Sequence, residues 1–176
     1  MDQFFRNGIP VLVCEPSCAS ALNDDLPDLI DDEKLQEKLR SGVFMIDQFL
    51  YQEIKAGRLN VRISSPEKEV MVHGHCHQKA LYGTQSMNKI LDKVEGLVHE
   101  EVDSGCCGMA GSFGYEKEHY ELSKKIGDEI LFPAVEKLNS EANVVACGFS
   151  CRHQIAHHTN RKPKHWVEVI VAERLD

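Results

Sequence analysis

The sequence predicts an α/β layered fold with a mainly parallel sheet of about four strands flanked by helices. Two observations lead to this prediction. Short apolar and β-branched runs alternate along the chain with longer stretches of helical periodicity. The composition, 42% hydrophobic and 27% charged in 176 residues, is that of a globular domain rather than a disordered chain. We therefore expect one structural unit over residues 1–176.

Four short runs are the expected strands, because their length and β-branched content suit the buried strands of a parallel sheet. They are Pro10–Cys14 (PVLVC), Glu69–His73 (EVMVH), Gly96–Val102 (GLVHEEV) and Asn143–Cys147 (NVVAC).

Four longer stretches carry apolar residues at helical spacing and are the expected helices. Gly127 and Pro133 are expected to bend or break the third of them. The four stretches are Asp32–Ala56, Gln78–Val94, Tyr115–Leu138 and Val167–Leu175.

Charge and cysteine content narrow the function classes. A net charge of −8, from 28 acidic and 20 basic residues, disfavours both a broad nucleic-acid-binding surface and an anionic membrane as partner. No apolar run approaches the roughly 18 residues of a transmembrane segment, and we expect no secretory signal. Seven cysteines, an odd number, accompany nine histidines. This combination favours a metal or redox site in a reducing, cytoplasmic setting over a disulfide framework.

One segment is repeated within the chain. Val11–Cys18 reads VLVCEPSC and Val144–Cys151 reads VVACGFSC, so Val, Cys, Ser and Cys coincide in register. Each copy is expected to be a strand that turns into a helix, with Ser17 and Ser150 as N-caps. We interpret the pair as the remains of a duplicated unit whose first copy is represented by its tail. The opening MDQFFRNGIP resembles the end of a helix, so the chain is expected to be a fragment of a longer protein.

Five cysteines follow the four expected strands in strand-to-helix turns. In a parallel sheet all such turns lie at the carboxyl edge of the strands, where ligand sites are built. Helices beginning after these cysteines would direct their positive ends to the same edge and stabilise thiolates. The five residues are Cys18, Cys76, Cys106, Cys107 and Cys151.

The segment Asp103–Gly114, DSGCCGMAGSFG, has glycine at every third position. In a regular strand Cys106 and Cys107 would point to opposite faces, whereas flanking glycines permit a backbone that turns both sulfurs inward. Glycines also leave amides free to approach thiolate or sulfide. The spacing matches neither a P-loop nor a dinucleotide-binding fingerprint.

Three segments together resemble the CCG, or cysteine-rich, domain family: His73–Leu81 (HGHCHQKAL), Ser104–Gly127 (SGCCGMAGSFGYEKEHYELSKKIG) and Cys147–Ile155 (CGFSCRHQI). Such domains occur in the iron–sulfur subunits of glycolate oxidase and anaerobic glycerol-3-phosphate dehydrogenase and in heterodisulfide reductase. They also occur in the C-terminal region of FAD-linked D-2-hydroxyacid dehydrogenases of the D-lactate or D-2-hydroxyglutarate type. The resemblance implies a Rossmann-like fold and a [4Fe–4S] cluster that relays electrons from a flavin to an acceptor.

The resemblance implies cluster ligands and their neighbours. The family often ends its motif with Cys-x-x-Cys, whereas here Gly148 stands three positions before Cys151, so a four-thiolate set is expected rather than a five-cysteine cluster. The expected ligands are Cys76, Cys106, Cys107 and Cys151, with Cys18 as an additional or substitute ligand. The expected neighbours of the cluster are His75, His77, Gly105, Gly108, Arg152 and His153.

Ferredoxin-like Cys-x2-Cys runs, which usually accompany the family, are absent from the sequence. The resemblance therefore places FAD on a flavoprotein dehydrogenase domain or subunit. The acceptor is a protein or a quinone system, which would hold the chain at the inner face of the membrane. No catalytic residue is identified, so substrate chemistry is expected on another domain or chain.

Other readings of the same residues stay open. Buried cysteines also serve simply as packing residues, which is the interpretation given to Cys14 and Cys147. His73, His75 and His77 alternate, so an extended backbone would place three imidazoles on one face, a possible zinc site. The alternatives to an iron–sulfur domain are thus a zinc-binding or thiol-catalytic module and a scaffold whose cluster site has decayed.

Overall fold

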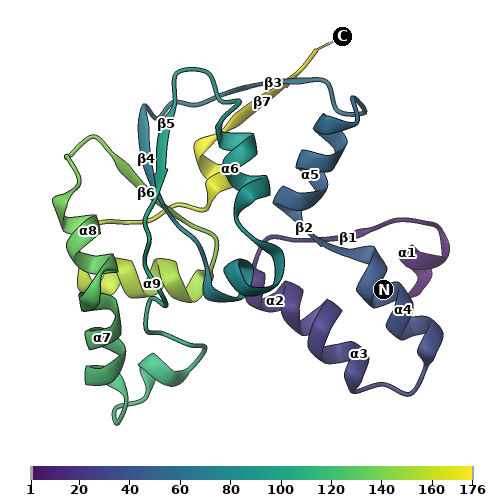
Figure 1. Ribbon diagram of the computed structural model, residues 1–176, viewed down its shortest axis with the longest axis horizontal. Coiled ribbons are helices and arrows are strands. Elements are labelled where there is room, and N and C mark those ends of the chain that lie inside the picture. The colour runs from purple at the N-terminus through teal and green to yellow at the C-terminus, as the bar shows by residue number, and fades with distance from the viewer. Residues whose placement is uncertain (1, 176) are drawn as a thin grey trace.

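The structure is a computed structural model that describes residues 2–175, and it contains helices and strands throughout (Figure 1). The helices are α1 (Asp2–Arg6), α2 (Pro16–Ser20), α3 (Leu26–Asp28), α4 (Glu33–Gly42), α5 (Ile46–Lys55), α6 (Gln85–Leu91), α7 (Tyr120–Glu129), α8 (Leu131–Lys137) and α9 (Phe149–His158). The strands are β1 (Val11–Val13), β2 (Val43–Met45), β3 (Val61–Ser64), β4 (Glu69–His73), β5 (Val98–Glu101), β6 (Asn143–Ala146) and β7 (Val171–Arg174). Short π-helical turns η1 (Ala21–Asp25) and η2 (Gln78–Tyr82) and 3₁₀ turns η3 (Phe113–Tyr115) and η4 (Trp166–Val169) complete the order.

The central sheet has three parallel strands in the order β5-β4-β6. Met71 of β4 pairs with Glu100 on one side and with Val144 on the other. All four expected strands are present, but β1 pairs in parallel with β2, away from the central sheet, and β3 pairs antiparallel with β7. The predicted α/β class is confirmed in that helices accompany small parallel sheets, whereas residues 2–175 do not form the single sheet of about four strands that was expected.

Three of the expected helices are interrupted. The stretch 32–56 divides into α4 and α5 because Val43–Met45 leaves the helix to pair with β1. The stretch 78–94 divides at Gly83, whose φ is +73°. The stretch 115–138 breaks at Ile130 rather than at Gly127 or Pro133. Pro133 lies in the first turn of α8, where its missing amide costs no helical hydrogen bond.

The prediction of a fourth helix over residues 167–175 is wrong. Trp166–Val169 forms a 3₁₀ turn, and the chain then continues as β7. Val171 pairs with Ser64 and Arg174 with Val61, so the backbone groups of this segment are satisfied by β3 across the antiparallel ladder. A partner strand more than a hundred residues away thus decided the conformation of a short apolar segment.

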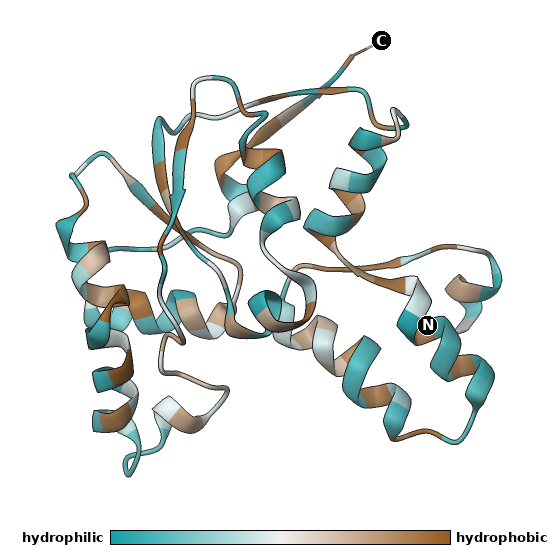
Figure 2. Ribbon diagram, in the orientation of Figure 1, coloured by the Kyte–Doolittle hydropathy of each residue, from teal (hydrophilic) through white to brown (hydrophobic). Residues whose placement is uncertain are grey.

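The core lies on both faces of the central sheet. Val70 and Val72 of β4 pack with α6 and Trp166 on one face, and Met71 packs with α8 and α9 on the other, in a second buried cluster. Alternate residues of a strand point to opposite faces, which produces this division. Figure 2 shows apolar and polar residues alternating along α7, which packs against α8 rather than against the sheet. No helix within residues 2–175 combines the length and apolar character needed to cross a lipid bilayer.

Candidate metal centre

Cysteines follow all three strands of the central sheet at its carboxyl edge. Cys76 comes three residues after the end of β4, Cys106 and Cys107 follow β5, and Cys151 lies in the first turn of α9 after β6. Because adjacent parallel strands end on the same side of a sheet, cysteines separated by up to 75 positions are brought to one place. This edge is the start of the candidate site.

The four sulfurs form a continuous row of contacts. Side-chain interactions link Cys76 to Cys106, Cys106 to Cys107 and Cys107 to Cys151. All seven cysteines of the chain are free of disulfide bonds. The row therefore consists of thiols and thiolates that are able to bind a metal ion or cluster.

Thiol-to-thiolate hydrogen bonds separate the acidities of the four groups. Hydrogen bonds from Cys107 and Cys76 lower the pKa of Cys106 to about 2, and the bond from Cys107 lowers the pKa of Cys151 to about 5. The pKa values of Cys76 and Cys107 are raised, chiefly by donating these same hydrogen bonds. Two thiolates thus stand ready at neutral pH before any metal binds.

A backbone amide also points at this row. Gly108 N donates to Cys106 Sγ at 3.3 Å. The φ of Gly108 is +95°, and a Cβ at this position would lie 2.0 Å from the carbonyl oxygen of Ser123, so only glycine fits. Gly105, by contrast, is exposed and has no atom within 4 Å of the place of a Cβ. Of the two glycines expected to flank the site, the surroundings require only Gly108.

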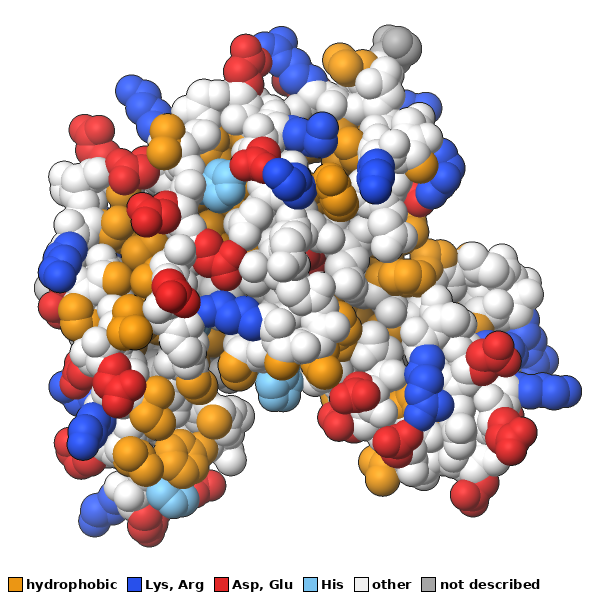
Figure 3. Space-filling model, viewed as in Figure 1, with side chains coloured by type: hydrophobic (Ala, Val, Ile, Leu, Met, Phe, Trp, Pro, Cys, Tyr) orange, Lys and Arg blue, Asp and Glu red, His pale blue; other side chains and the backbone are white. Residues whose placement is uncertain are grey.

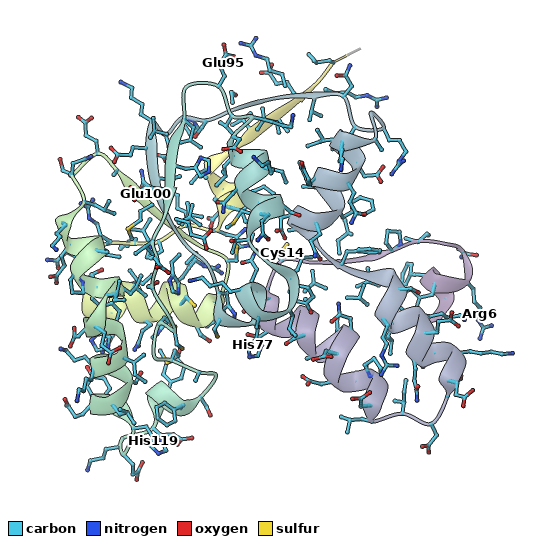
Figure 4. The ribbon with its side chains drawn as sticks, in the orientation of Figure 1. Arg6, Cys14, His77, Glu95, Glu100 and His119 are labelled. Atoms are coloured by element: carbon cyan, nitrogen blue, oxygen red, sulfur yellow. The ribbon has the colours of Figure 1, made fainter. Side chains whose placement is uncertain are left out.

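The row opens into a pocket of about 350 Å³. Cys76, Cys106 and Cys107 line it together with His75, His77 and Ser17. Figure 3 shows the molecule indented along the lower edge of this view, between the part that carries α7 and the part that carries α2 and α3. His77 lies at the top of this indentation (Figure 4). The candidate site is accordingly buried on the sheet side and reachable from this concave face.

Three histidines follow one another at the end of β4, but they face different partners. His75 Nε2 lies 3.3 Å from Ser17 Oγ, and its Nδ1 accepts from the amide of His77 at 3.1 Å. His77 is exposed, with Nδ1 3.0 Å from Ser20 Oγ. The chain leaves the extended conformation after His73, so the rings of His75 and His77 contact each other edge to face at 5.4 Å, whereas the ring of His73 lies against Ser104, Cys107 and Cys151. The prediction that these three histidines together form a zinc site is therefore wrong.

His73 was expected as one of three imidazoles of a zinc site, but not among the neighbours of the four cysteines. It is the last residue of β4, and its side chain is fully buried. One of its ring nitrogens and the sulfurs of Cys107 and Cys151 all lie within 4.8 Å of one another. Its Nδ1 is 2.9 Å from Ser104 Oγ. The signal available in the sequence was its place at the carboxyl end of a central strand, three positions before Cys76.

The other expected neighbours lie farther from the sulfur row. Cys18 is exposed on α2 and is not among the residues that line the pocket, although Ser17 is. Arg152 donates to the carbonyl oxygens of Ala146 and Cys147, at 2.9 and 2.6 Å, and so closes the end of β6. His153 is exposed and stacks between the rings of Phe149 and His157.

The two copies of the internal repeat do adopt the same strand-to-helix form. β1 leads into α2, and β6 leads into α9. The N-caps are Glu15 and Gly148, which align with each other, rather than Ser17 and Ser150. A side chain at 148 would place its Cβ 2.2 Å from the ring of His75, so this cap must be glycine.

The helix expected to begin directly after Cys107 does not form there. The chain instead turns through Gly108 and Gly111, and the next helical residues are those of the 3₁₀ turn at Phe113. In the repeat copies, Cys18 and Cys151 lie inside the first turn of α2 and α9 rather than before it. After β4 the helical conformation begins at Cys76 itself and continues into η2, so here too the cysteine lies within the first turn.

Comparison with known proteins shows relatives among dehydrogenases. The chain is 29% identical over 163 residues to a subunit of the anaerobic glycerol-3-phosphate dehydrogenase of Escherichia coli strain K12. This match covers 93% of this chain and 40% of that relative. It is 25% identical over 172 residues to D-2-hydroxyglutarate dehydrogenase of Pantoea ananatis, covering 97% of this chain and 16% of the relative. A 99-residue match to D-2-hydroxyglutarate dehydrogenase of Pseudomonas putida is 31% identical and covers 55% of this chain and 9% of that protein.

These relatives are much longer than the chain. It spans 40% of the glycerol-3-phosphate dehydrogenase subunit and 16% or less of the two D-2-hydroxyglutarate dehydrogenases above. No protein-family model and no solved structure matches it. The chain is thus similar to parts of redox enzymes.

Proposed function

We propose that this chain is a CCG-type iron–sulfur electron-transfer domain of an FAD-linked dehydrogenase that oxidises a 2-hydroxyacid of the glycolate, D-lactate or D-2-hydroxyglutarate type. The observation that carries the proposal is the row of four sulfurs, from Cys76 through Cys106 and Cys107 to Cys151, at one edge of a parallel sheet. A glycerol-3-phosphate dehydrogenase subunit and D-2-hydroxyglutarate dehydrogenases among the relatives support the redox setting.

The donor set fits a [4Fe–4S] cluster. Such clusters are held by four cysteine thiolates and tuned by hydrogen bonds to their sulfurs. Here three of the four cysteines, Cys76, Cys106 and Cys107, line a pocket of about 350 Å³, and Gly108 N already donates to Cys106. When bound, the cluster would accept and release one electron at a time. Cys76, Cys106, Cys107 and Cys151 would hold it.

The proposal assigns substrate oxidation and electron transfer to different domains or subunits. Oxidation of a secondary alcohol such as D-2-hydroxyglutarate to a ketone releases two electrons and two protons. A flavin on another domain or subunit would take up both electrons, and the present domain would pass them on singly to an acceptor protein or quinone. This chain's own residues then bind and insulate the redox centre, with the concave face at His77 as its accessible side. In this arrangement the domain works in the cytoplasm, held at the inner face of the membrane through a partner if the acceptor is a quinone.

Anaerobic reconstitution with iron and sulfide tests the proposal. We expect about four iron and four sulfide per chain, a brown protein, and a paramagnetic resonance signal after reduction. Cys106→Ser and Cys151→Ser should lose the cluster. Cys18→Ser, at an exposed cysteine outside the row, is the matched control and should retain it. A folded protein that stays colourless under these conditions contradicts the proposal.

A zinc site is the second candidate, and a specific observation favours it. His73, Cys107 and Cys151 form a buried group whose ligand atoms all lie within 4.8 Å of one another, which suits a mixed Cys/His zinc site. This alternative predicts one zinc per chain and no iron after both aerobic and anaerobic preparation. Elemental analysis of the same samples separates the two functions.

A further inference from the structure

One ring nitrogen of His73 is hydrogen-bonded, and the other has no hydrogen-bond partner among the described residues. Its Nδ1 lies 2.9 Å from the hydroxyl oxygen of Ser104, which is itself buried. Its Nε2 is buried and has no hydrogen-bond partner among residues 2–175. A buried nitrogen that has lost its water and gained no partner is destabilising, so native structures rarely leave one without a reason.

The sulfurs next to His73 explain why its Nε2 has no hydrogen-bond partner. The side chain of His73 approaches both Cys107 and Cys151 to within 4.8 Å. Ser104 occupies Nδ1, so the nitrogen available to the sulfurs is Nε2. Cys107 and Cys151 are buried members of the same cluster of residues between the sheet and α9. The imidazole therefore lies against the buried members of the sulfur row and is not among the residues that line the pocket of Cys76, Cys106 and Cys107.

We propose that His73 Nε2–H donates a hydrogen bond to the thiolates of Cys107 and Cys151 once they bind a metal centre, and that Ser104 holds the ring in this tautomer. The proposal rests on a metal centre in the sulfur row, as proposed above, but not on its type. In the required tautomer Nδ1 is unprotonated and accepts from the serine hydroxyl, while Nε2 carries the proton. His73 is then a positioning residue that acts through the thiolates.

Neighbouring contacts hold this arrangement rigidly. The carbonyl oxygen of Ser104 accepts from Lys79 Nζ at 2.6 Å, and the amide of Ser104 donates to the carbonyl oxygen of Val102 at 2.9 Å. His73 itself is fixed by the β4–β6 ladder, where it pairs with Ala146. Both ends of the hydrogen bond between Ser104 and His73 are therefore anchored in backbone structure.

A donated hydrogen bond withdraws electron density from a thiolate and stabilises the reduced, more negative state of a centre. His73→Leu should therefore shift the midpoint potential of the reconstituted centre to a more negative value. His73→Gln, whose amide nitrogen can take the place of Nε2, should restore most of the shift. Ser104→Ala should shift the potential in the same direction by a smaller amount. His99→Gln, on the neighbouring strand β5, is the control and should leave the potential unchanged.

The measurement is a redox titration followed by paramagnetic resonance, with ¹⁵N-labelled histidine to detect nitrogen coupling. The wild type should show weak coupling to His73 and no directly bound nitrogen. Strong coupling that disappears in His73→Gln would overturn the proposal and identify His73 as a ligand. Equal potentials in the wild type, His73→Leu and Ser104→Ala would also overturn it. If His73→Leu does not fold, Ser104→Ala and His73→Gln still decide the matter.

Cobalt substitution distinguishes failure of this inference from failure of the proposed function. If the wild type takes up no iron, the iron–sulfur proposal is wrong, and the same variants are loaded with Co²⁺. Loss of the hydrogen bond makes the thiolates better electron donors, so the sulfur-to-cobalt absorption band of His73→Leu should move to longer wavelength. An unmoved band, with unchanged cobalt affinity, would reject a role for His73 at either kind of centre.

Discussion

Glu15 Oε2 accepts a hydrogen bond from the backbone amide of Phe149 at 2.5 Å, although 134 positions separate the two residues. Glu15 is itself the N-cap of α2, and Phe149 is the first residue of α9. The carboxylate of one repeat copy thus satisfies a free amide at the helix start of the other. This contact joins the β1–α2 segment to the helix that carries Cys151.

Removing the Glu15 carboxylate should weaken the contact between the β1–α2 segment and α9 and so lower the stability of the fold. Glu15→Ala leaves the amide of Phe149 without its partner, so we expect a loss of about 1 kcal/mol in the free energy of unfolding. Urea denaturation measures it. Glu95→Ala is the control, because Glu95 pairs with Arg62 at the surface with 71% of its side chain exposed and should change stability by less than about 0.5 kcal/mol. Equal losses in the two variants would show that the cap is unimportant.

The two glycines beside the cysteine pair should respond differently to a methyl group. Gly108→Ala forces a residue with a Cβ into positive φ and against the carbonyl oxygen of Ser123, so we expect a loss of roughly 2–4 kcal/mol and reduced metal uptake. Gly105→Ala meets open space and should be neutral within about 0.5 kcal/mol. Denaturation curves and metal analysis of both variants test this contrast, and a stable Gly108→Ala protein with full metal content would refute it.

Protonation of His165 should weaken the fold at low pH. Burial lowers its pKa below the ordinary value, and the neutral ring accepts from the amide of Val167 through Nδ1 while Nε2 donates to the carbonyl oxygen of Cys14. The neutral form is favoured in the fold, so this stability is complete above about pH 6.5 and is lost as the pH falls below that value.

The free energy of unfolding at pH 7.5, 6.5 and 5.5 measures this dependence. His165→Asn keeps an acceptor for the amide of Val167 but cannot be protonated, so its stability should fall less over this range than that of the wild type. The same slope in both proteins would mean that other groups are responsible.

Cys147 should behave as a core residue rather than a ligand. It is buried, its Sγ lies 3.5 Å from Met87 Sδ, and burial raises the pKa of its thiol. Cys147→Ala should cost about 1 kcal/mol and leave metal uptake unchanged. Cys147→Ser should cost more, because it buries a hydroxyl group among apolar side chains. Loss of metal in Cys147→Ala, at unchanged fold, would instead make it a ligand.

The metal-free protein should carry a thiolate at Cys106 under acidic conditions. Because its pKa is lowered to about 2 and it lines the pocket, we expect iodoacetamide to modify Cys106 at a rate that is nearly constant between pH 5.5 and 8. The rate itself will be modest, since nucleophilicity falls with pKa. Mass spectrometry of a protein carrying Cys14→Ser and Cys18→Ser, which removes both exposed thiols, follows the modification. A rate that rises tenfold per pH unit would contradict the lowered pKa, and metal loading should block the reaction.

The sequence predicted local elements well where their signal was local. All four expected strands are present, and Glu69–His73 has the expected bounds. Failures occurred where a distant partner decided the outcome. Val43–Met45 fits a helical pattern but forms a strand on β1, and Val171–Arg174 forms a strand on β3. Periodicity describes which face of an element is apolar, but it does not show which strand will pair with it.

The residues around the four cysteines were also predicted incompletely, because contacts between distant segments decide which of them lie there. Ser17 and Ser150 are the better N-cap residues by type, but Glu15 and Gly148 occupy the caps, because Glu15 reaches across to α9 and Gly148 makes room for the ring of His75. The sequence pattern favoured His75 and His77 over His73. The burial of His73 and its contact with Ser104 arise from the loop after β5, which no local pattern of residues 73–77 describes.

The sequence by itself determined the class of the fold and the position of Cys76, Cys106, Cys107 and Cys151 just beyond strands, because composition and alternation act within a few residues. Only the tertiary structure decided that the three strands before them are neighbours, that Cys18 stays on the surface and that His73 closes the row. Strand order and side-chain contacts depend on burial and hydrogen bonding between segments far apart in the chain, and these are established only when the whole chain packs.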